Sequence, residues 1–446
     1  MRRTLLLIPH EIASVPVFGF GWVLGLMVLA AIVVTACLAY NKQRPLQYWK
    51  SNGLVWAIAA GVIAWVMPNI ELLSATGQPV GMAIRGYGVM LLLGVTASVA
   101  LALWRARRYG ISEEVMLGIA PWLLVGGIVG ARLFYVVEYR DRFFTGDLGS
   151  TVRNLIDFTG GGLVVYGAFI GGFLAGSVYV LRHRLPFLTV GDVIVPCLFI
   201  GLSLGRLGCL MNGCCYGNAC EDDWASLRFP NGSPVFEDQL NSGELLGIRL
   251  DGQGTEVKSV EPGSLAAREG IAVGDTISKL QSVRSVEEVD PTRPAEDAPL
   301  GLMAIVNGKE FYWPASRFPA TANPVRASQV ISSLGGLILC LSLCLFSRFV
   351  QRPGIVMLVG FASYAVLRFG MEMLRNDEPG QFGTTLTISQ WVSVVVFLLS
   401  CGALVWLRSQ RRGTALQARP SASPQPDPHH PDPHQPDPHQ PDPVGG

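Results

Sequence analysis

The sequence has little charge and almost no histidine. Only 15% of its 446 residues are Asp, Glu, Lys or Arg, while half are hydrophobic, and 51 are glycine. A chain of this length with so few charges is too apolar for a soluble enzyme, and abundant glycine suits packed membrane helices. The formal net charge is +1, which offers no basis for binding nucleic acid.

The shortage of histidine restricts the catalytic possibilities. Outside the C-terminal tail the only histidines are His10 and His183. The stretch "GLSLG" (201–205) fits the G-x-S-x-G motif of serine hydrolases, but that motif needs a strand–turn–helix setting and a nearby base. Ser203 instead lies in the middle of an apolar run, so we interpret it as a small helix-packing residue.

Long apolar runs dominate the chain and predict an all-α polytopic membrane protein. Nine of them could cross roughly 30 Å of hydrocarbon at about 1.5 Å per residue. They lie near 18–40, 53–70, 86–104, 115–136, 161–181, 189–211, 328–347, 354–375 and 389–407.

The loops between these runs indicate an orientation. Clusters of Lys and Arg occur at 41–50, 105–110, 182–184, 347–352 and 408–412, all on one side of a nine-span arrangement. Because cytoplasmic loops carry an excess of Lys and Arg, we expect that side to be cytoplasmic. The N-terminus is then outside and the C-terminus inside.

Polar residues occur near the predicted outer ends of five spans. Such residues are costly inside a bilayer and often mark a functional site, although each could also be a snorkelling or helix-pairing residue. Several arginines with few carboxylates suit a phosphate, and in the outer leaflet a phosphate means a phospholipid headgroup. The residues are Tyr87, Arg132, Tyr166, Arg206, Asn212, Arg368 and Glu372.

Several stretches in order resemble the prolipoprotein diacylglyceryl transferase family. The resemblance covers roughly 84–217 and 324–407, and its most specific part is "GRLGCLMNGCCYG" (205–217). The other stretches are "IRGYGVM" (84–90), "GARLFYVVEY" (130–139), "GGLVVYGAFIGG" (161–172), "PVRASQ" (324–329) and "LRFGMEMLR" (367–375).

The resemblance implies a reaction and a location. Such an enzyme moves the diacylglyceryl group of phosphatidylglycerol to the lipobox cysteine of a prolipoprotein, and glycerol phosphate leaves as a thioether forms. It implies a bacterial cytoplasmic (inner) membrane protein whose active site lies toward the periplasmic face. Its partners would be phosphatidylglycerol, prolipoprotein substrates and membrane lipid, and we expect no cofactor and no metal.

The resemblance also implies roles for individual residues. It gives Arg206 the task of holding the phosphate or steadying the leaving group. The other residues expected to be catalytic are Tyr87, Tyr166, Arg368 and Glu372. Those expected to bind substrate are Arg132, Asn212, Gly217 and Gln329.

The sequence departs from the family pattern in three respects, at four positions. Tyr166 stands where the family often has a histidine proposed as catalytic, and Arg326 stands in place of another histidine. Cys209 and Cys214 occupy positions where many members have asparagine and glutamate. A phenol with a pKa of about 10 is a poor base at neutral pH, so Tyr166 weakens a simple histidine-base mechanism.

The reaction can be described without that histidine. A thiol with a pKa of about 8.5 is only slightly ionised at pH 7, and nearby cations raise the thiolate fraction. Arg206 and Arg368 would neutralise the charge that builds on the departing phosphate. Glu372 could orient Arg368 or accept the thiol proton, or it could simply form an intrahelical salt bridge with Arg368.

Four cysteines lie close together in "CLMNGCCYGNAC" (209–220). Their spacing matches no common zinc pattern and no histidine is nearby, so structural roles are favoured over a metal site. In an oxidising compartment, a disulfide from Cys214 or Cys215 to Cys209 or Cys220 is one such role.

A polar insert separates the two halves of the core. The insert spans 218–327. Its central part resembles a PDZ domain of about 242–313, and the resemblance lies in "LLGIRLDGQGTEVKSVEPGSLAAREGIAVGDTISKL" (245–280). In this stretch "LLGI" stands in for the carboxylate-binding loop. The insert should lie outside, where it could gather substrate proteins by strand addition or serve only as a lid.

The remaining segments complete the predicted organisation. Residues 1–83 add two N-terminal spans, 84–217 and 328–407 form the two parts of the core, and 408–446 form a tail. The tail is rich in Pro, Asp and His, so it should be an extended cytoplasmic segment that is a spacer or a weak metal binder.

Two other functions fit parts of the sequence. A phospholipid transporter or flippase would also need outer arginines, but should have inverted repeats or midplane charges. A non-catalytic peptide receptor would act through the PDZ-like insert and would keep its function without Arg206.

Overall fold

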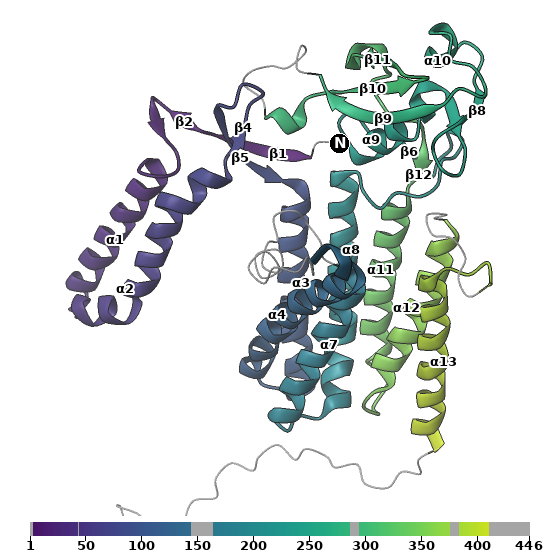
Figure 1. Ribbon diagram of the computed structural model, residues 1–446. Helices are drawn as coiled ribbons and strands as arrows, with labels where there is room; N and C mark the ends of the chain where they lie inside the picture. The colour runs from purple at the N-terminus through teal and green to yellow at the C-terminus, as the bar shows by residue number, and fades with distance from the viewer. Residues whose placement is uncertain (1–2, 43, 144–163, 286–293, 375–382, 410–446) are drawn as a thin grey trace, which may run out of the picture.

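The protein is mainly a bundle of long apolar helices with a mixed α/β insert at one end (Figure 1). In this computed structural model the described residues are 3–42, 44–143, 164–285, 294–374 and 383–409. Eight helical segments among them are long and apolar enough to cross a membrane, and a shorter apolar helix covers Gly167–Arg182. The chain is thus a polytopic helical membrane protein.

The helices of the bundle alternate in direction along the chain. The insert lies at one end, whereas the loops after α3, α7 and α11 and the end of α13 lie at the other (Figure 1). The bundle consists of α3 (Gly86–Arg108), α4 (Glu113–Glu138), α7 (Val165–Arg182), α8 (Phe187–Asn212), α11 (Ser328–Phe346), α12 (Ile355–Met373) and α13 (Ile388–Ser409).

The N-terminal region forms a separate hairpin beside the bundle. Helix α1 (Trp22–Tyr40) and helix α2 (Pro45–Gly61) lie to one side of it, and both have exposed apolar surfaces (Figure 1). A three-stranded antiparallel sheet of β1 (Thr4–Pro9), β5 (Pro79–Arg85) and β4 (Leu72–Leu73) joins this hairpin to α3. The hairpin tip points away from the insert.

Glycine allows α4 and α7 to pack at very short range. A Cβ atom on Gly130 would lie 2.3 Å from the carbonyl oxygen of Gly167 and 2.7 Å from the Cα of Gly171. Small residues permit such close helix contact in membranes, where the hydrophobic effect does not drive helices together. These glycines therefore fix the α4–α7 pair.

Helix α8 lies against α3, α11 and α12. Midway along it, Ser203 Oγ is 3.1 Å from Ser333 Oγ of α11, and Ser333 Oγ also donates to the Ser203 carbonyl at 3.0 Å. This contact confirms the prediction that Ser203 is a helix-packing residue.

A buried Arg–Asp network ties four helices together at the end opposite the insert. Arg105 of α3 donates to the backbone oxygens of Asp192 (2.8 Å) and Val193 (3.2 Å) of α8 and to Ser347 Oγ (3.2 Å). The Asp192 carboxylate accepts from the backbone N–H groups of Gly354 and Met357, each at 2.7 Å. It thereby caps the N-terminus of α12. Arg105 belongs to the Lys- and Arg-rich cluster at 105–110, which the sequence predicts to be a cytoplasmic loop, but the residue is buried in α3; Asp192 is not among the predicted residues.

The insert has its own hydrophobic core, which continues onto the end of α8. Its buried residues include Phe229, Phe236 and Leu302, and Leu210 of α8 and Tyr216 pack against them. The elements are β6 (Ser226–Leu227), α9 (Pro234–Asn241), β7 (Ile248–Leu250), β8 (Val257–Val260), α10 (Leu265–Arg268), β9 (Ile277–Arg284), β10 (Leu300–Val306), β11 (Lys309–Trp313) and β12 (Val325–Arg326).

The strands described in the insert form three small sheets. Strands β9, β10 and β11 make one, β7 pairs with β8, and β12 pairs with β6 at the entrance to α11. In the predicted carboxylate-binding loop, the N–H groups of Leu246 and Gly247 donate to the carbonyls of Gly243 and Glu244, and that of Ile248 donates to Gly243. These amides are therefore engaged within the loop.

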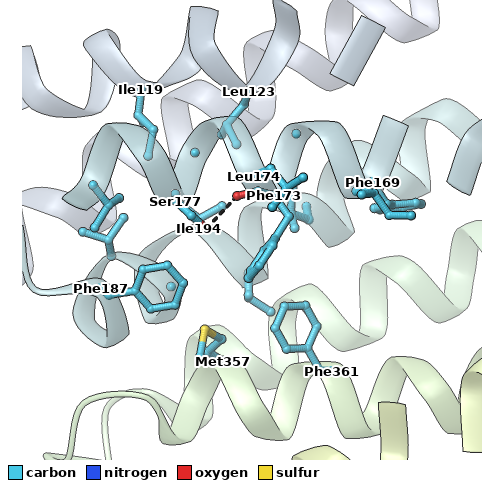
Figure 2. Close-up of a pocket in the computed structure, with 18 of the residues that line it drawn as sticks. Ile119, Leu123, Phe169, Phe173, Leu174, Ser177, Phe187, Ile194, Met357 and Phe361 are labelled. Carbon is cyan, nitrogen blue, oxygen red and sulfur yellow. Dashed lines mark hydrogen bonds between the residues drawn. The ribbon is translucent and has the colours of Figure 1, made fainter. Parts of the chain in front are cut away.

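An apolar groove of about 510 Å³ runs along α7 toward α8 and α12. Figure 2 shows Phe169 and Phe173 of α7 on the same groove as Phe361 of α12. Ser177 of α7 is a polar residue on this surface, and its hydroxyl donates to the Phe173 carbonyl of the same helix. The groove offers an open hydrocarbon surface between helices of the bundle.

Candidate functional site

Two of the predicted arginines meet in one small cavity at the insert end of the bundle. Arg206 of α8 and Arg368 of α12 line it together with Ser328 and Ser332 of α11 and Tyr364 of α12. Its volume is about 10 Å³, room for roughly one water molecule. Two arginines, two serines and a tyrosine from three helices thus line one cavity.

Arg368 forms a partly buried ion pair with Glu372 one turn further along α12. The Arg368 Nη2 atom lies 2.9 Å from Glu372 Oε2, and it donates a hydrogen bond to Ser389 Oγ of α13 at 2.9 Å. The Arg368 side chain is 24% exposed, whereas that of Glu372 is 4% exposed. The buried carboxylate of Glu372 therefore fixes the position of the Arg368 guanidinium, which remains partly exposed.

Tyr87 lies on α3 against the same end of α8. A Cβ atom on Gly208 would lie 3.2 Å from the Tyr87 ring, so the absence of a side chain at Gly208 lets the ring approach. Tyr87 is 42% exposed and within electrostatic range of Arg206 and of Cys209, Cys214 and Cys215. The phenol thus lies against the same end of α8 as Arg206.

The loop that follows α8 is clamped onto the start of α11. The Gln329 side chain is fully buried and donates from Nε2 to the Cys214 carbonyl at 2.9 Å, while Ser328 Oγ donates to the Cys215 carbonyl at 2.7 Å. Gly213 (φ 75°) and Cys215 (φ 58°) both adopt left-handed conformations, which turn the chain back over α8. The predicted residue Gln329 therefore positions this loop.

Gly217 sits where three segments meet. Its N–H donates to the Arg326 carbonyl at 3.0 Å, and the next N–H, of Asn218, donates to the Leu374 carbonyl at 3.2 Å. A Cβ atom on Gly217 would lie 2.7 Å from Arg326 Cβ and 2.8 Å from the Leu374 oxygen. Only glycine fits here, and it joins the loop after α8 to the end of α12, two residues beyond Glu372.

Two other predicted residues lie in different surroundings. Arg132 is buried in α4, with its guanidinium carbon 5.6 Å and 5.4 Å from the ring centres of Tyr135 and Phe143. Asn212, the last residue of α8, lines a separate hollow of about 500 Å³ between β1 and the insert. Tyr166 belongs to α7, but its side chain lies outside the described residues.

The structure adds polar residues that the sequence analysis missed. Ser328 and Ser332 bring hydroxyls to the cavity from one face of α11, and Ser389 holds Arg368 from α13. Their only sequence signal is hydroxyl residues at the outer ends of apolar runs, as in "SQVISS" (328–333). Serine is so common in membrane helices that this signal alone does not distinguish a site from helix packing.

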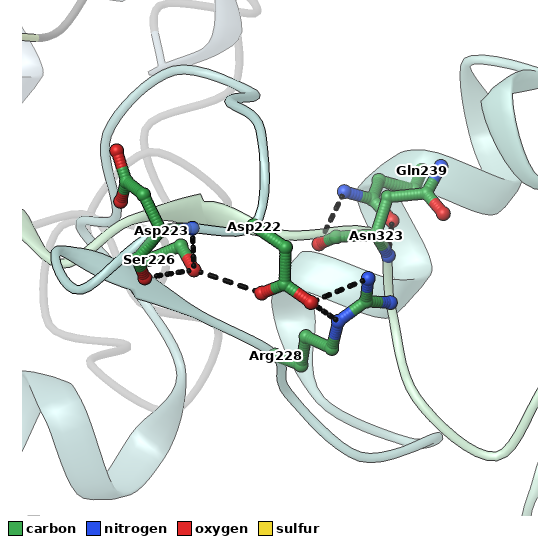
Figure 3. Close-up of polar contacts among 6 residues, drawn as sticks. All are labelled: Asp222, Asp223, Ser226, Arg228, Gln239 and Asn323. Atoms are coloured by element: carbon green, nitrogen blue, oxygen red, sulfur yellow. Dashed lines mark hydrogen bonds and ion pairs between the residues drawn. The ribbon is translucent and has the colours of Figure 1, made fainter.

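Charged residues of the insert surround the loop after α8. Figure 3 shows Asp222, Asp223 and Ser226 beside Arg228. Arg228 donates to Asp222 at 3.1 Å, and this hydrogen bond lowers the pKa of the Asp222 carboxyl. A hydrogen bond of 2.5 Å from Arg326 likewise lowers the pKa of Asp223. Arg326, at the position of the missing histidine, thus joins β12 to the start of the insert.

The nine cysteines all lie within the described residues, and no disulfide joins any two of them. The fold brings three of them together, since the sulfur atoms of Cys209, Cys214 and Cys215 all lie within 4.8 Å of one another. Cys220, which the sequence places nearby, is not part of this group.

These features define a helical membrane protein with a cationic site at one end of its bundle. The family model of prolipoprotein diacylglyceryl transferases matches residues 78–406. A phosphatidylglycerol–prolipoprotein diacylglyceryl transferase of Rhodopirellula baltica is 42% identical over 440 residues, which are 90% of this chain and 88% of the relative. The chain belongs to the prolipoprotein diacylglyceryl transferase family.

More distant relatives match shorter parts of the chain. A phosphatidylglycerol–prolipoprotein diacylglyceryl transferase of Clostridium tetani is 33% identical over 139 residues, 31% of this chain and 53% of the relative. One of Dehalococcoides mccartyi is 34% identical over 137 residues, 30% of this chain and 50% of the relative.

Proposed function

We propose that this chain transfers the diacylglyceryl group of phosphatidylglycerol to the lipobox cysteine thiol of a prolipoprotein, through a site centred on Arg206 and Arg368. Membership of a diacylglyceryl transferase family supports the reaction. The observation that carries the choice of site is that these two arginines, from α8 and α12, line a single cavity.

The arginine pair suits a departing phosphate. As the thiolate attacks the glyceryl carbon, the carbon–oxygen bond breaks and negative charge moves onto the phosphate. Guanidinium groups offer paired donors to phosphate oxygens, and their effect is larger where water is excluded. Arg206 binds the phosphate, Arg368 stabilises the leaving group, and the hydroxyl of Ser332 adds a donor.

Tyr87, Glu372 and the clamped loop assist this pair. Glu372 is almost fully buried behind Arg368, so its main role is to orient that guanidinium. Tyr87, partly exposed beside Arg206, is placed to contact the headgroup. Gln329 and Gly217 act as positioning residues because they fix the loop that follows α8: Gln329 holds it to α11, and Gly217 lets it pack against the end of α12.

Two of the predicted residues, Asn212 and Arg132, lie outside this cluster of contacts. Asn212 and Arg132 would meet other parts of the substrates, Asn212 in the hollow beneath the insert and Arg132 near the end of α4. The role of Tyr166 rests on the family resemblance.

An apolar surface is also available for the acyl chains. The groove along α7 is lined almost entirely by hydrocarbon, including Phe169, Phe173 and Phe361. A phospholipid with its phosphate at the arginines needs a hydrocarbon surface of this kind within the membrane. We propose that an acyl chain lies in this groove during transfer.

We further propose nine membrane spans, with the site on the periplasmic side of a bacterial inner membrane. Helix α7 is the ninth span, since its 18 residues extend for about 27 Å. The Lys- and Arg-rich loops at the end away from the insert support a cytoplasmic location for that end.

The insert is then a periplasmic cover over the site. Its core packs on Leu210 of α8, and Arg326 ties it to the loop after α8. Because the amides of the "LLGI" loop are engaged, we favour the lid role over capture of a peptide carboxylate. A PDZ-like fold for about 242–313 remains a prediction.

The direct test is transfer by the purified protein. The full chain in detergent is incubated with phosphatidylglycerol and a lipobox peptide, and the thioether product is detected by mass spectrometry. We expect product from the parent chain and a loss of at least about 100-fold with Arg206→Ala, as for removal of a transition-state donor. Arg107→Ala is the matched control, because Arg107 is an exposed residue at the other end of α3.

The outcomes separate the possible explanations. Product from the parent and from Arg107→Ala, but not from Arg206→Ala, supports the proposed site. Equal product from all three proteins would show that Arg206 lies outside the site. Absence of product from the folded parent, with the Rhodopirellula baltica relative active in the same assay, would refute the proposed reaction.

A further inference from the structure

The three-cysteine cluster has the composition of a metal site that the sequence spacing did not predict. Cys209 lies on the last turn of α8, and Cys214 and Cys215 follow in the loop. Their sulfur atoms lie within 4.8 Å of one another. Zinc–sulfur bonds of about 2.3 Å in tetrahedral geometry require sulfur–sulfur separations of about 3.8 Å, so small rotations of the side chains would suffice.

The backbone around the cluster is already in place. The N–H of Cys214 donates to the Cys209 carbonyl at 3.1 Å, which closes the loop over the helix end. Gln329 and Ser328 hold the carbonyls of Cys214 and Cys215. The backbone of Cys215 is left-handed (φ 58°), and two residues later the N–H of Gly217 is hydrogen-bonded to the Arg326 carbonyl. A site whose ligands are fixed by neighbouring contacts binds a metal without further ordering.

The charge balance of such a site is also favourable. Three thiolates around Zn²⁺ carry a net charge of −1. Arg206 lies three residues before Cys209, on the same side of α8, where i,i+3 side chains are neighbours. A positively charged residue therefore lies one helical turn from the excess negative charge.

We propose that Cys209, Cys214 and Cys215 bind Zn²⁺ and that the fourth coordination position takes the thiol of the lipobox cysteine. This inference rests on the proposed function, because it supplies the nucleophile of that reaction. Three protein ligands with one open position are the pattern of catalytic zinc sites, and a thiol bound to zinc loses its proton. This ion would replace the base that the family histidine would otherwise provide.

The step balances without any oxidant or reductant. The lipobox thiol releases its proton to solvent when its sulfur binds the ion. A sulfur electron pair then forms the bond to the glyceryl carbon, and the carbon–oxygen bond to phosphate breaks with its electrons on oxygen. Glycerol phosphate takes up a proton from solvent and leaves, while the zinc keeps its charge.

The first test measures metal binding by the full chain in detergent. The protein is reduced, treated with a chelator, and titrated with Cd²⁺, whose thiolate complexes absorb in the ultraviolet. We expect one equivalent to bind to the parent and to Cys220→Ser, a matched control in a neighbouring cysteine outside the cluster. Cys209→Ser and Cys215→Ser should each weaken binding by at least about tenfold.

Two results of this first test would overturn the proposal. One is equal Cd²⁺ binding by the parent and by the cluster variants. The other is a disulfide among Cys209, Cys214 and Cys215 in protein isolated from membranes, detected by counting free thiols under non-reducing conditions. Both metal binding and free thiols are measured on the parent protein itself, so the test can still be decided if a variant fails to fold.

The second test relates the ion to transfer. Chelation should lower transfer by the parent at least about tenfold, and added Zn²⁺ should restore it. Full transfer after chelation, with the loss of metal confirmed, would overturn the role of the ion. If cysteine-dependent Cd²⁺ binding is observed but transfer is absent under all conditions, the proposed function fails while the metal site stands.

Discussion

The Arg368–Glu372 pair makes a quantitative prediction because its two members are unequally buried. Replacing Arg368 by Gln leaves a carboxylate that is 4% exposed without its cation. Removal of one partner from a buried ion pair destabilises a protein by about 3–5 kcal/mol. Because this pair is partly hydrated, we expect Arg368→Gln to lower the free energy of unfolding by about 3 kcal/mol. Glu372→Gln leaves an arginine that is 24% exposed and still donates to Ser389, so we expect a cost of about 1 kcal/mol.

The double variant then tests the interaction itself. With both charges removed, the only cost is that of the lost hydrogen bonds, so we expect the free energy of unfolding to fall by about 1–2 kcal/mol. The three values give a coupling energy of about 2–3 kcal/mol, within the range measured for contacting residues. The assay is the free energy of unfolding of the purified protein in mixed micelles, followed by tryptophan fluorescence.

The same proteins separate stability from chemistry. We expect the double variant to be more stable than Arg368→Gln yet still inactive in transfer, because the guanidinium is needed at the phosphate. The reasoning would be refuted if Glu372→Gln destabilised the protein more than Arg368→Gln, or if the costs of the two single variants simply added.

Two further predictions concern the contacts around the site. Gly217→Val should abolish transfer, because the new side chain would collide with Arg326 and the Leu374 carbonyl. Gly402→Ala is the control and should retain the parent rate, because there is open space around Gly402. Equal transfer rates for the two variants would contradict this account. The second concerns Asp222 and Asp223, whose pKa values are lowered in the folded state by hydrogen bonds from Arg228 and Arg326. Their stabilisation is present above the unfolded pKa of about 3.9 and is lost as pH falls through the lower folded pKa. The unfolding temperature should therefore fall more between pH 7 and pH 3 for the parent than for the Asp222→Asn/Asp223→Asn double variant, and equal falls would argue against these pairs.

Much of the architecture could be read from local sequence. Hydrophobic length is a property of each segment alone, so the apolar runs correspond to helices that the structure contains. The insert between two helical parts was likewise visible as a change in composition. Arg206 and Arg368 stood out because charged residues are rare and costly in apolar segments.

The tertiary structure decided which of these residues meet. Arg206 and Arg368 are 162 positions apart and line one cavity, whereas Arg132 and Asn212 have other neighbours. The clamp from Gln329 to Cys214, the Arg105–Asp192 network and the three-sulfur cluster also depend on how α8 packs against other helices. Apolar periodicity specifies which segments enter the membrane, but the contacts between them depend on close-fitting side chains from distant parts of the chain, and those are set only when the bundle is assembled.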